Sequence, residues 1–185
     1  MKVALIIGLL SVCIRVSAQS EDFPELQKYS VQDIHTRFPF DQVKKIILVS
    51  YGVDASKGDK DNLGDEPKRF PLKGEQIAFD EMDDVVAIPK EKIDTVADIL
   101  FNTCYRWRET EYTPAMCFLP RNAIIFTDVN GKAICYIEVC FECNRMRPSD
   151  KRVEIEKEIC DNTLDKLESF FLKSGLRTGI KKVKK

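Results

Sequence analysis

The chain has 185 residues, of which 32% are charged, and a formal net charge of −1 at pH 7. Such a balanced charge argues against nucleic-acid binding, which usually needs a basic surface. No glycine-rich phosphate loop is present, so the sequence does not predict nucleotide chemistry either.

The first segment is typical of a secretory signal peptide. A basic residue precedes an apolar run that is shorter than the roughly 20 residues needed to span a bilayer. Val16 and Ala18 then occupy the −3 and −1 positions of a cleavage site. We expect removal of residues 1–18, export to the periplasm or out of the cell, and no membrane span in the mature chain. A lipoprotein anchored through Cys13 is a minor alternative, because a bulky valine precedes that cysteine.

Removal of those 18 residues from 185 leaves 167, a length that suits one domain. The segment contains two of the 29 basic residues, which leaves 27 against 30 acidic residues and a net charge of about −3. We expect residues 19–180 to form a single α+β domain. The basic residues 181–185 are interpreted as a solvated tail.

The first half of the domain predicts one short helix, three strands and one long loop. A helix is expected within residues 21–40, and the continuous apolar run in residues 43–51 is typical of a central strand. Residues 52–69 are rich in Gly, Asp, Lys and Ser and indicate an exposed loop, whose role the sequence leaves open. Residues 76–79 and 85–88 are read as short strands around a turn.

Two amphipathic helices are predicted, one before and one after a cysteine-rich hairpin. Apolar residues from Ile93 to Cys104 recur at helical spacing, and Pro89 suits the start of that helix. The second helix is expected from Val153 to Lys173, because its apolar residues form one stripe. Both helices should pack on the sheet.

The hairpin runs from Cys117 to Cys143 and turns at residues 128–131, with the sequence Asp-Val-Asn-Gly. A type I turn with a left-handed glycine would place Cys117 opposite Cys143. A two-residue turn would shift the register by one and place Arg121 opposite Cys140. Pro120 cannot donate to a strand ladder, so pairing should be interrupted there.

Six cysteines remain after removal of the leader, and an even number in an exported protein favours disulfides. Alternation along the second strand points Cys140 and Cys143 to opposite faces unless the chain turns at Phe141 and Glu142. A bond from Cys117 to either cysteine is therefore at least as plausible as a bond within the C-x-x-C motif.

Three chemical hypotheses follow for Cys117, Cys140 and Cys143. The first is a structural disulfide with a spare thiol. The second is thiol or disulfide redox chemistry, in which Arg121 would stabilise a thiolate. The third and weakest is a soft-metal site for Zn or Cu, since zinc sites usually have four ligands and the single histidine, His35, is distant in sequence. Glu142 or Cys160 could complete the set, but nothing in the spacing requires it.

The motifs C-F-L-P-R-N and V-C-F-E-C, joined by the apolar hairpin, resemble an uncharacterised family of exported bacterial proteins. Members share C-x-x-P-R followed by C-F-E-C on one hairpin. The resemblance implies a signature made of six residues: Cys117, Pro120, Arg121, Cys140, Glu142 and Cys143. It implies no reaction and no cofactor.

The overall interpretation is a small, largely antiparallel sheet covered by about two helices, with a cysteine-rich hairpin in its C-terminal half. The sequence favours a non-enzymatic structural or ligand-binding domain, whose ligand or protein partner is unknown. No catalytic residues are assigned. A thiol/disulfide redox protein is the alternative, and a soft-metal binding protein is a second alternative.

Overall fold

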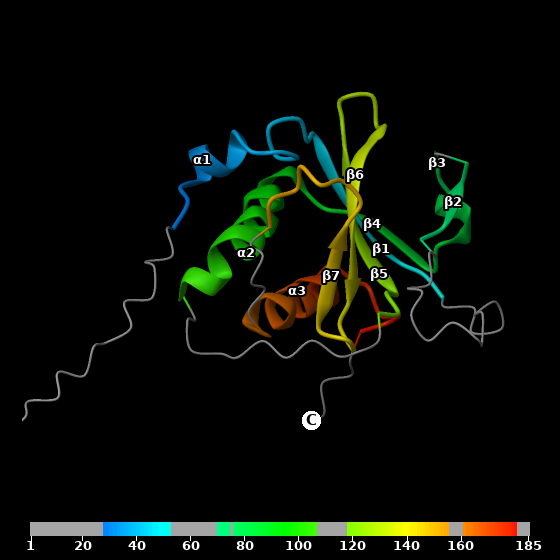
Figure 1. Ribbon diagram of the computed structural model, residues 1–185. Helices are drawn as coiled ribbons and strands as arrows, with labels where there is room; N and C mark the ends of the chain where they lie inside the picture. The colour runs from blue at the N-terminus through cyan, green and yellow to red at the C-terminus, as the bar shows by residue number, and fades with distance from the viewer. Residues whose placement is uncertain (1–27, 53–69, 75, 107–117, 156–160, 181–185) are drawn as a thin grey trace, which may run out of the picture.

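The computed structural model describes residues 28–52, 70–74, 76–106, 118–155 and 161–180. Its centre is a five-stranded antiparallel sheet with the order β4-β1-β5-β6-β7 (Figure 1). The strands are β1 (Lys45–Ser50), β4 (Asp84–Ala87), β5 (Asn122–Thr127), β6 (Ala133–Cys140) and β7 (Arg145–Pro148). A separate two-stranded sheet pairs β2 (Leu72–Lys73) with β3 (Gln76–Ile77).

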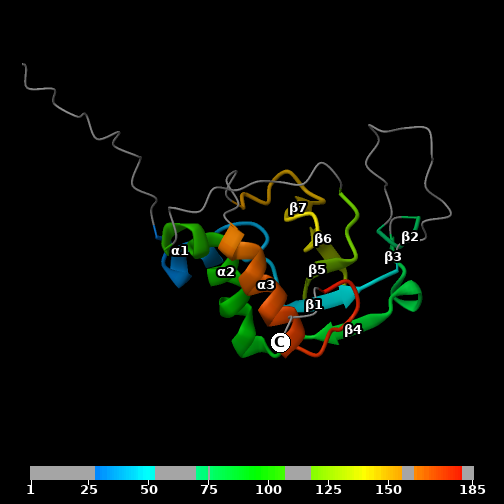
Figure 2. The ribbon, with the colours of Figure 1, turned by 90° about the horizontal axis from the view of Figure 1, so that it is seen from below.

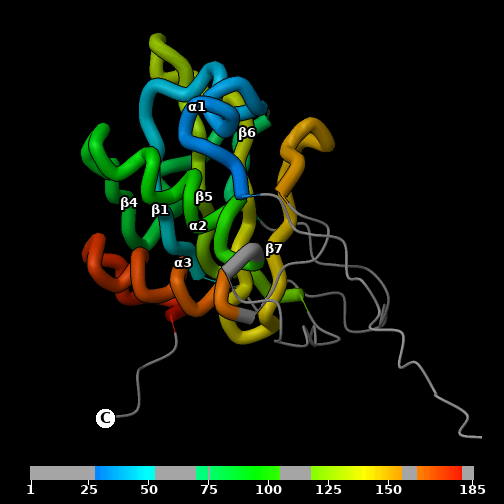
Figure 3. The backbone as a smooth tube through the Cα atoms, turned by 90° about the vertical axis from the view of Figure 1, so that its left-hand side faces the viewer, coloured from blue at the N-terminus to red at the C-terminus, as the bar shows by residue number. Residues whose placement is uncertain are grey.

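Three helices lie on one face of the main sheet, as seen from below in Figure 2 and from the helix side in Figure 3. They are α1 (Val31–His35), α2 (Ile93–Arg106) and α3 (Asp161–Lys173). The β2–β3 hairpin lies on the opposite side (Figures 1 and 2). The predicted α+β class, with an antiparallel sheet covered by helices, is confirmed.

The main hydrophobic core lies between the helices and the sheet. Alternate residues of the central strands point into it, because successive side chains of a strand face opposite ways. Helix α2 contributes the apolar stripe that its spacing predicts, and α3 contributes another. The fully buried members of this core include Ile46, Leu48, Ile124, Phe126, Ile137, Val139, Val96, Leu167 and Phe171.

A second, smaller core lies on the other face of the sheet. Val49 from β1 and Tyr51 just after it join Ala123 and Ile125 from β5, and Phe70 beside the β2–β3 hairpin packs on them. All six residues of β5 are therefore buried, as expected for a central strand covered on both faces.

The β5–β6 turn combines features of both predicted registers. Asp128 and Lys132 flank the turn, the Asp128 N–H donates to the Lys132 carbonyl at 2.9 Å, and Gly131 has a φ of 76°. A bulge between Phe126 and Thr127 then shifts the pairing by one residue. Beyond it the strands pair as the two-residue turn would have placed them.

Two predicted elements differ from the structure. The runs at 76–79 and 85–88 do contain strands, but β3 pairs with β2 and β4 pairs with β1, so they are not partners. The C-terminal helix was predicted from Val153, whereas residues 153–155 are not helical and the described helix begins at Asp161. Val153 is nevertheless buried in the main core, which explains why its apolar character fitted the helical stripe.

The C-terminal helix ends as its sequence predicts. The Gly175 φ is 105°, and the Leu176 N–H donates back to the Phe171 carbonyl at 3.2 Å, which closes the last turn. Residues after this turn return to the sheet, where the Asn122 amide donates to the Thr178 carbonyl at 3.1 Å. Within the described residues, no helix is long and apolar enough to cross a membrane.

Candidate functional site

The C-x-x-C motif forms the connection between β6 and β7. Cys140 ends β6, residues 141–144 make a tight turn in which Asn144 has a φ of 52°, and β7 begins at Arg145. This reversal brings Cys140 and Cys143 together as a disulfide, with their Cα atoms 5.2 Å apart. The sequence identified the condition for this bond, a turn at Phe141 and Glu142, but did not predict β7.

Both sulfur-bearing side chains are shielded from solvent. Cys140 is 3% exposed and Cys143 is 1% exposed, and the ring of Phe118 packs on them. The backbone of Leu119 adds polar contacts, because its N–H donates to Cys143 Sγ at 3.4 Å and its carbonyl oxygen lies 3.4 Å from Cys140 Sγ. The Cys143 N–H also donates to Cys140 Sγ at 3.2 Å. The segment that enters β5 therefore covers the disulfide.

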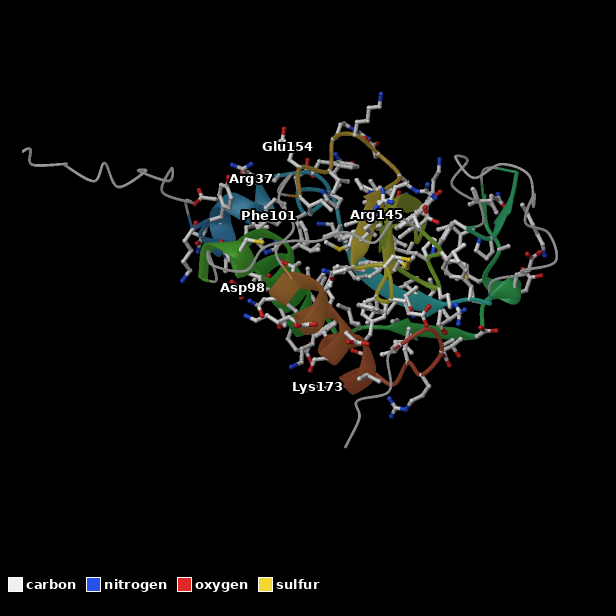
Figure 4. The ribbon with its side chains drawn as sticks, turned by 60° about the horizontal axis from the view of Figure 1, so that its bottom comes forward. Arg37, Asp98, Phe101, Arg145, Glu154 and Lys173 are labelled. Carbon is white, nitrogen blue, oxygen red and sulfur yellow. A yellow bond between two sulfur atoms is a disulfide. The ribbon has the colours of Figure 1, made fainter. Side chains whose placement is uncertain are left out.

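Two arginines of β7 lie over the outer side of this cluster. The guanidinium carbons of Arg145 and Arg147 are 5.2 Å and 4.6 Å from the centre of the Phe118 ring, distances that allow cation–π attraction. Arg145 is labelled in Figure 4, beside the β6–β7 region. Arg145 and Arg147 therefore contact the ring that packs on the disulfide, whereas the predicted Arg121 has its aliphatic part beside Gly179.

The predicted supporting residues have separate positions. Pro120 is buried before the start of β5, consistent with its inability to donate to the ladder. Arg121 packs its aliphatic part close to Gly179, and Glu142 is exposed on the turn. Cys117 lies outside the described residues, so its predicted role as a disulfide, redox or metal-binding residue stays a prediction.

The other described cysteines do not join this cluster. Cys135 is a buried free thiol on the helix-covered face, and burial raises its pKa to about 12, so it is a poor nucleophile. Cys104 is disulfide-bonded, and its Sγ lies 3.4 Å from Thr163 Oγ1 on α3. Within the described part of the chain, no group of three or more His, Cys, Asp or Glu side chains could hold a metal ion.

A groove opens beside the cysteine turn, between the β2–β3 side and the β6–β7 edge. It has a volume of about 360 Å³. Tyr136 and Phe70 stack face to face in its wall, with ring centres 4.0 Å apart and planes 13° from parallel. Its lining consists of Phe70, Leu72, Tyr136, Glu138, Arg147, Pro148 and Ser149.

An ion pair forms the polar part of this groove. Glu138 on β6 and Arg147 on β7 are direct cross-strand partners. Arg147 Nε donates to Glu138 Oε2 at 2.9 Å, and Nη2 forms an ion pair with the same oxygen at 2.9 Å. The Glu138 side chain is only 5% exposed, whereas that of Arg147 is 31% exposed. The Tyr51 hydroxyl also donates to Glu138 Oε1 at 3.4 Å, and burial raises the pKa of Tyr51, which keeps this donor protonated.

The sequence did not identify this groove. The second core lies on the face of the sheet that carries Glu138, and this side chain is buried. The sequence does contain one signal that both faces of the sheet are covered. The strands at residues 45–50 and 122–127 are apolar at consecutive positions, which is typical of strands that are covered on both faces.

A second hollow, of about 610 Å³, lies between α1 and the start of α2. His35 Nε2 there is 2.8 Å from Asp94 Oδ1, and both side chains are about half exposed. His35 is therefore a surface residue with an acidic neighbour. None of the described cysteine, serine or threonine residues lines this hollow, so it offers no nucleophile for the histidine.

Comparison with protein-family models, with curated proteins and with solved structures finds no match for this chain. The resemblance to exported bacterial proteins with C-x-x-P-R and C-F-E-C motifs therefore stays a prediction.

Proposed function

We propose that this chain is an exported, non-enzymatic ligand-binding domain, in which the Cys140–Cys143 disulfide is a structural staple. The observation that carries this proposal is the burial of both sulfur atoms beneath Phe118. Thiol–disulfide exchange requires in-line access of an attacking thiolate to a sulfur atom. A disulfide covered in this way is suited to holding the chain and not to exchanging with a substrate.

The position of the disulfide indicates that it would hold the β6–β7 turn and the register of these two strands. It closes the turn between β6 and β7, and β7 is the last strand of the described five-stranded sheet. The pairing of these strands sets Glu138 opposite Arg147. A bond that fixes the turn therefore also fixes the register that builds the groove.

Export is supported by the disulfide and by the signal-like leader. Disulfides persist in oxidising compartments and are rare where thiols are kept reduced. In the described part of the chain, Cys104 is disulfide-bonded, and Cys140 and Cys143 are bonded to each other. A periplasmic or secreted location is the proposal that fits these observations.

One observation favours redox chemistry as a second candidate. The Cys143 N–H points at Cys140 Sγ, and such a donor would stabilise a thiolate on Cys140 after reduction. A soft-metal site has less support, because the sulfur atoms of Cys140 and Cys143 are bonded to each other and a metal ligand must be a thiolate.

Replacing both cysteines of the turn separates these candidates. The Cys140→Ser/Cys143→Ser variant should lower the free energy of unfolding by about 2 kcal/mol, the value that loop-closure entropy gives for so short a loop. Chemical denaturation of the oxidised proteins measures this loss. Cys135→Ala is the matched control, because it removes a buried sulfur that is not in a disulfide.

The wild-type protein and the Cys140→Ser/Cys143→Ser variant should also be assayed for dithiothreitol-dependent reduction of insulin. We expect no catalysis by the wild-type protein above the uncatalysed rate. The proposal would be wrong if the wild-type protein catalysed this reduction and the double variant lost it while keeping the wild-type free energy of unfolding.

A further inference from the structure

We infer that the groove beside the cysteine turn binds a small amphipathic organic anion, with an apolar body and one carboxylate or sulfonate group. This inference rests on the proposed ligand-binding function and assigns it a site and a ligand class. The site consists of an apolar wall made by Phe70, Leu72, Tyr136 and Pro148, and a charged end made by Arg147 with Glu138 beneath it.

The sign of the ligand charge follows from the exposure of the ion pair. Glu138 is almost completely covered, with 5% of its side chain exposed, and it is held by Arg147 and Tyr51. Arg147 retains 31% exposure, so the charge that a ligand meets in the groove is a guanidinium. A guanidinium presents planar N–H donors that match a carboxylate or a sulfonate, which favours an anion over a cation.

The apolar body of the ligand follows from the wall. The side chains of Phe70 and Tyr136 form a stacked aromatic surface, and Leu72 beside them is 44% exposed, which is high for a large apolar residue in a groove. A ligand that covered Leu72 would remove this apolar area from water, a favourable transfer. The volume of about 360 Å³ lies at the small end of the range for ligand pockets.

The geometry is also held in place before a ligand binds. Arg147 is fixed from two directions, by a hydrogen bond and an ion pair to Glu138 Oε2 and by the Phe118 ring, 4.6 Å from its guanidinium carbon. The Tyr136 N–H donates to Ser149 Oγ at 2.9 Å, which fixes the far end of the groove. Groups that are already ordered lose little conformational entropy on binding, which favours affinity.

Two fluorescent probes test both parts of this inference on the oxidised mature chain. The first, 8-anilinonaphthalene-1-sulfonate, carries an aromatic body and a sulfonate, and the second, N-phenyl-1-naphthylamine, is the same body without the charge. We expect the wild-type protein to bind the sulfonate at least about tenfold more tightly than the neutral probe, the factor expected for one charge-assisted contact. Backbone resonances of Tyr136 and Ser149 should shift during the titration.

The variants remove the guanidinium in two ways. Arg147→Gln leaves Glu138 buried without its partner and can lower stability, whereas Glu138→Gln/Arg147→Gln removes both charges and keeps hydrogen-bonding side chains. We expect the double variant to bind the sulfonate about tenfold more weakly than wild type, with binding of the neutral probe unchanged within about twofold. Arg152→Gln is the matched control, because Arg152 is an exposed arginine paired with Asp150 outside the groove.

Three results would overturn the inference. A folded double variant that bound the sulfonate as tightly as wild type would show that Arg147 does not select the anion. Binding of the neutral probe alone would contradict the anionic class while supporting a ligand-binding function. Binding of neither probe by a wild-type protein whose disulfide is intact would contradict the ligand class and leave the structural role of the disulfide standing.

Discussion

The two faces of the main sheet are built from different kinds of residue. The helix-covered face is almost entirely apolar: Leu48 and Phe126 of the strands and Phe171 of α3 are fully buried in the core between the sheet and the helices. The opposite face also buries apolar residues, but it adds a cross-strand ion pair, a buried tyrosine hydroxyl and a groove. The buried ion pair adds little net stability when compared with apolar residues of the same size. The comparison therefore assigns most of the stability to the helix-covered face and the recognition chemistry to the other.

The largest expected effect is the loss of a large core side chain on the helix-covered face. Phe126 is fully buried and packs edge-on against Phe40, with ring centres 5.4 Å apart. Phe126→Ala should lower the free energy of unfolding by about 4 kcal/mol, because it removes apolar burial and leaves a cavity. Chemical denaturation measures this loss.

Leu72→Ala is the contrasting variant on the other face. Leu72 is 44% exposed, so its truncation should cost less than about 1 kcal/mol. If Phe126→Ala and Leu72→Ala lowered the free energy of unfolding equally, the proposal that most of the stability comes from the helix-covered face would be wrong.

A smaller effect is expected where the helix-covered face ends in polar residues. The Ser50 hydroxyl donates to Asp84 Oδ2 at 2.6 Å, and the Arg177 N–H donates to the same oxygen at 3.3 Å. These hydrogen bonds, with that of Ser50 first, hold the pKa of Asp84 below its ordinary value of 3.8. Their stabilisation is therefore fully present above that pH and is lost as the pH falls through the lower pKa of the folded state.

Ser50→Ala should cost about 1 kcal/mol or less at neutral pH, because Asp84 is half-buried at the end of the sheet and solvent partly screens the contact. The difference between wild type and variant should shrink on acidification below pH 3.8, as thermal unfolding at several pH values can measure. If the stability difference between wild type and Ser50→Ala grew on acidification, the hydrogen bond from Ser50 to ionised Asp84 would not be its source.

The sequence predicted those elements whose signals are local. The helix at residues 93–106, the strands at 45–50 and 122–127, and the turn at 128–131 all follow from periodicity or turn chemistry. The strand β7 was missed because Arg-Met-Arg-Pro is only four residues long, too short for a clear periodic signal, and ends in a proline, which argues against a strand. It pairs through backbone hydrogen bonds, and its arginines are placed by Glu138 and Phe118, which are tertiary contacts.

The candidate site could be predicted only in part. The sequence located chemistry at Cys140 and Cys143 and stated that their bond required a turn, which the structure contains. It could not choose this bond over one to Cys117, because six cysteines permit many pairings. It also could not reveal the groove at Glu138, because Phe70, which lines the same groove, is distant in sequence.

The most direct test of the central claim is alkylation of the mature protein, followed by peptide mass spectrometry, with and without reduction. If the disulfide is a buried staple, Cys140 and Cys143 should be unlabelled without a reductant and labelled after reduction in denaturant. Cys135 should be labelled in denaturant alone, since its thiol is free but buried. Rapid labelling of Cys140 or Cys143 in the native protein without a reductant would contradict the staple and make the turn a working thiol site.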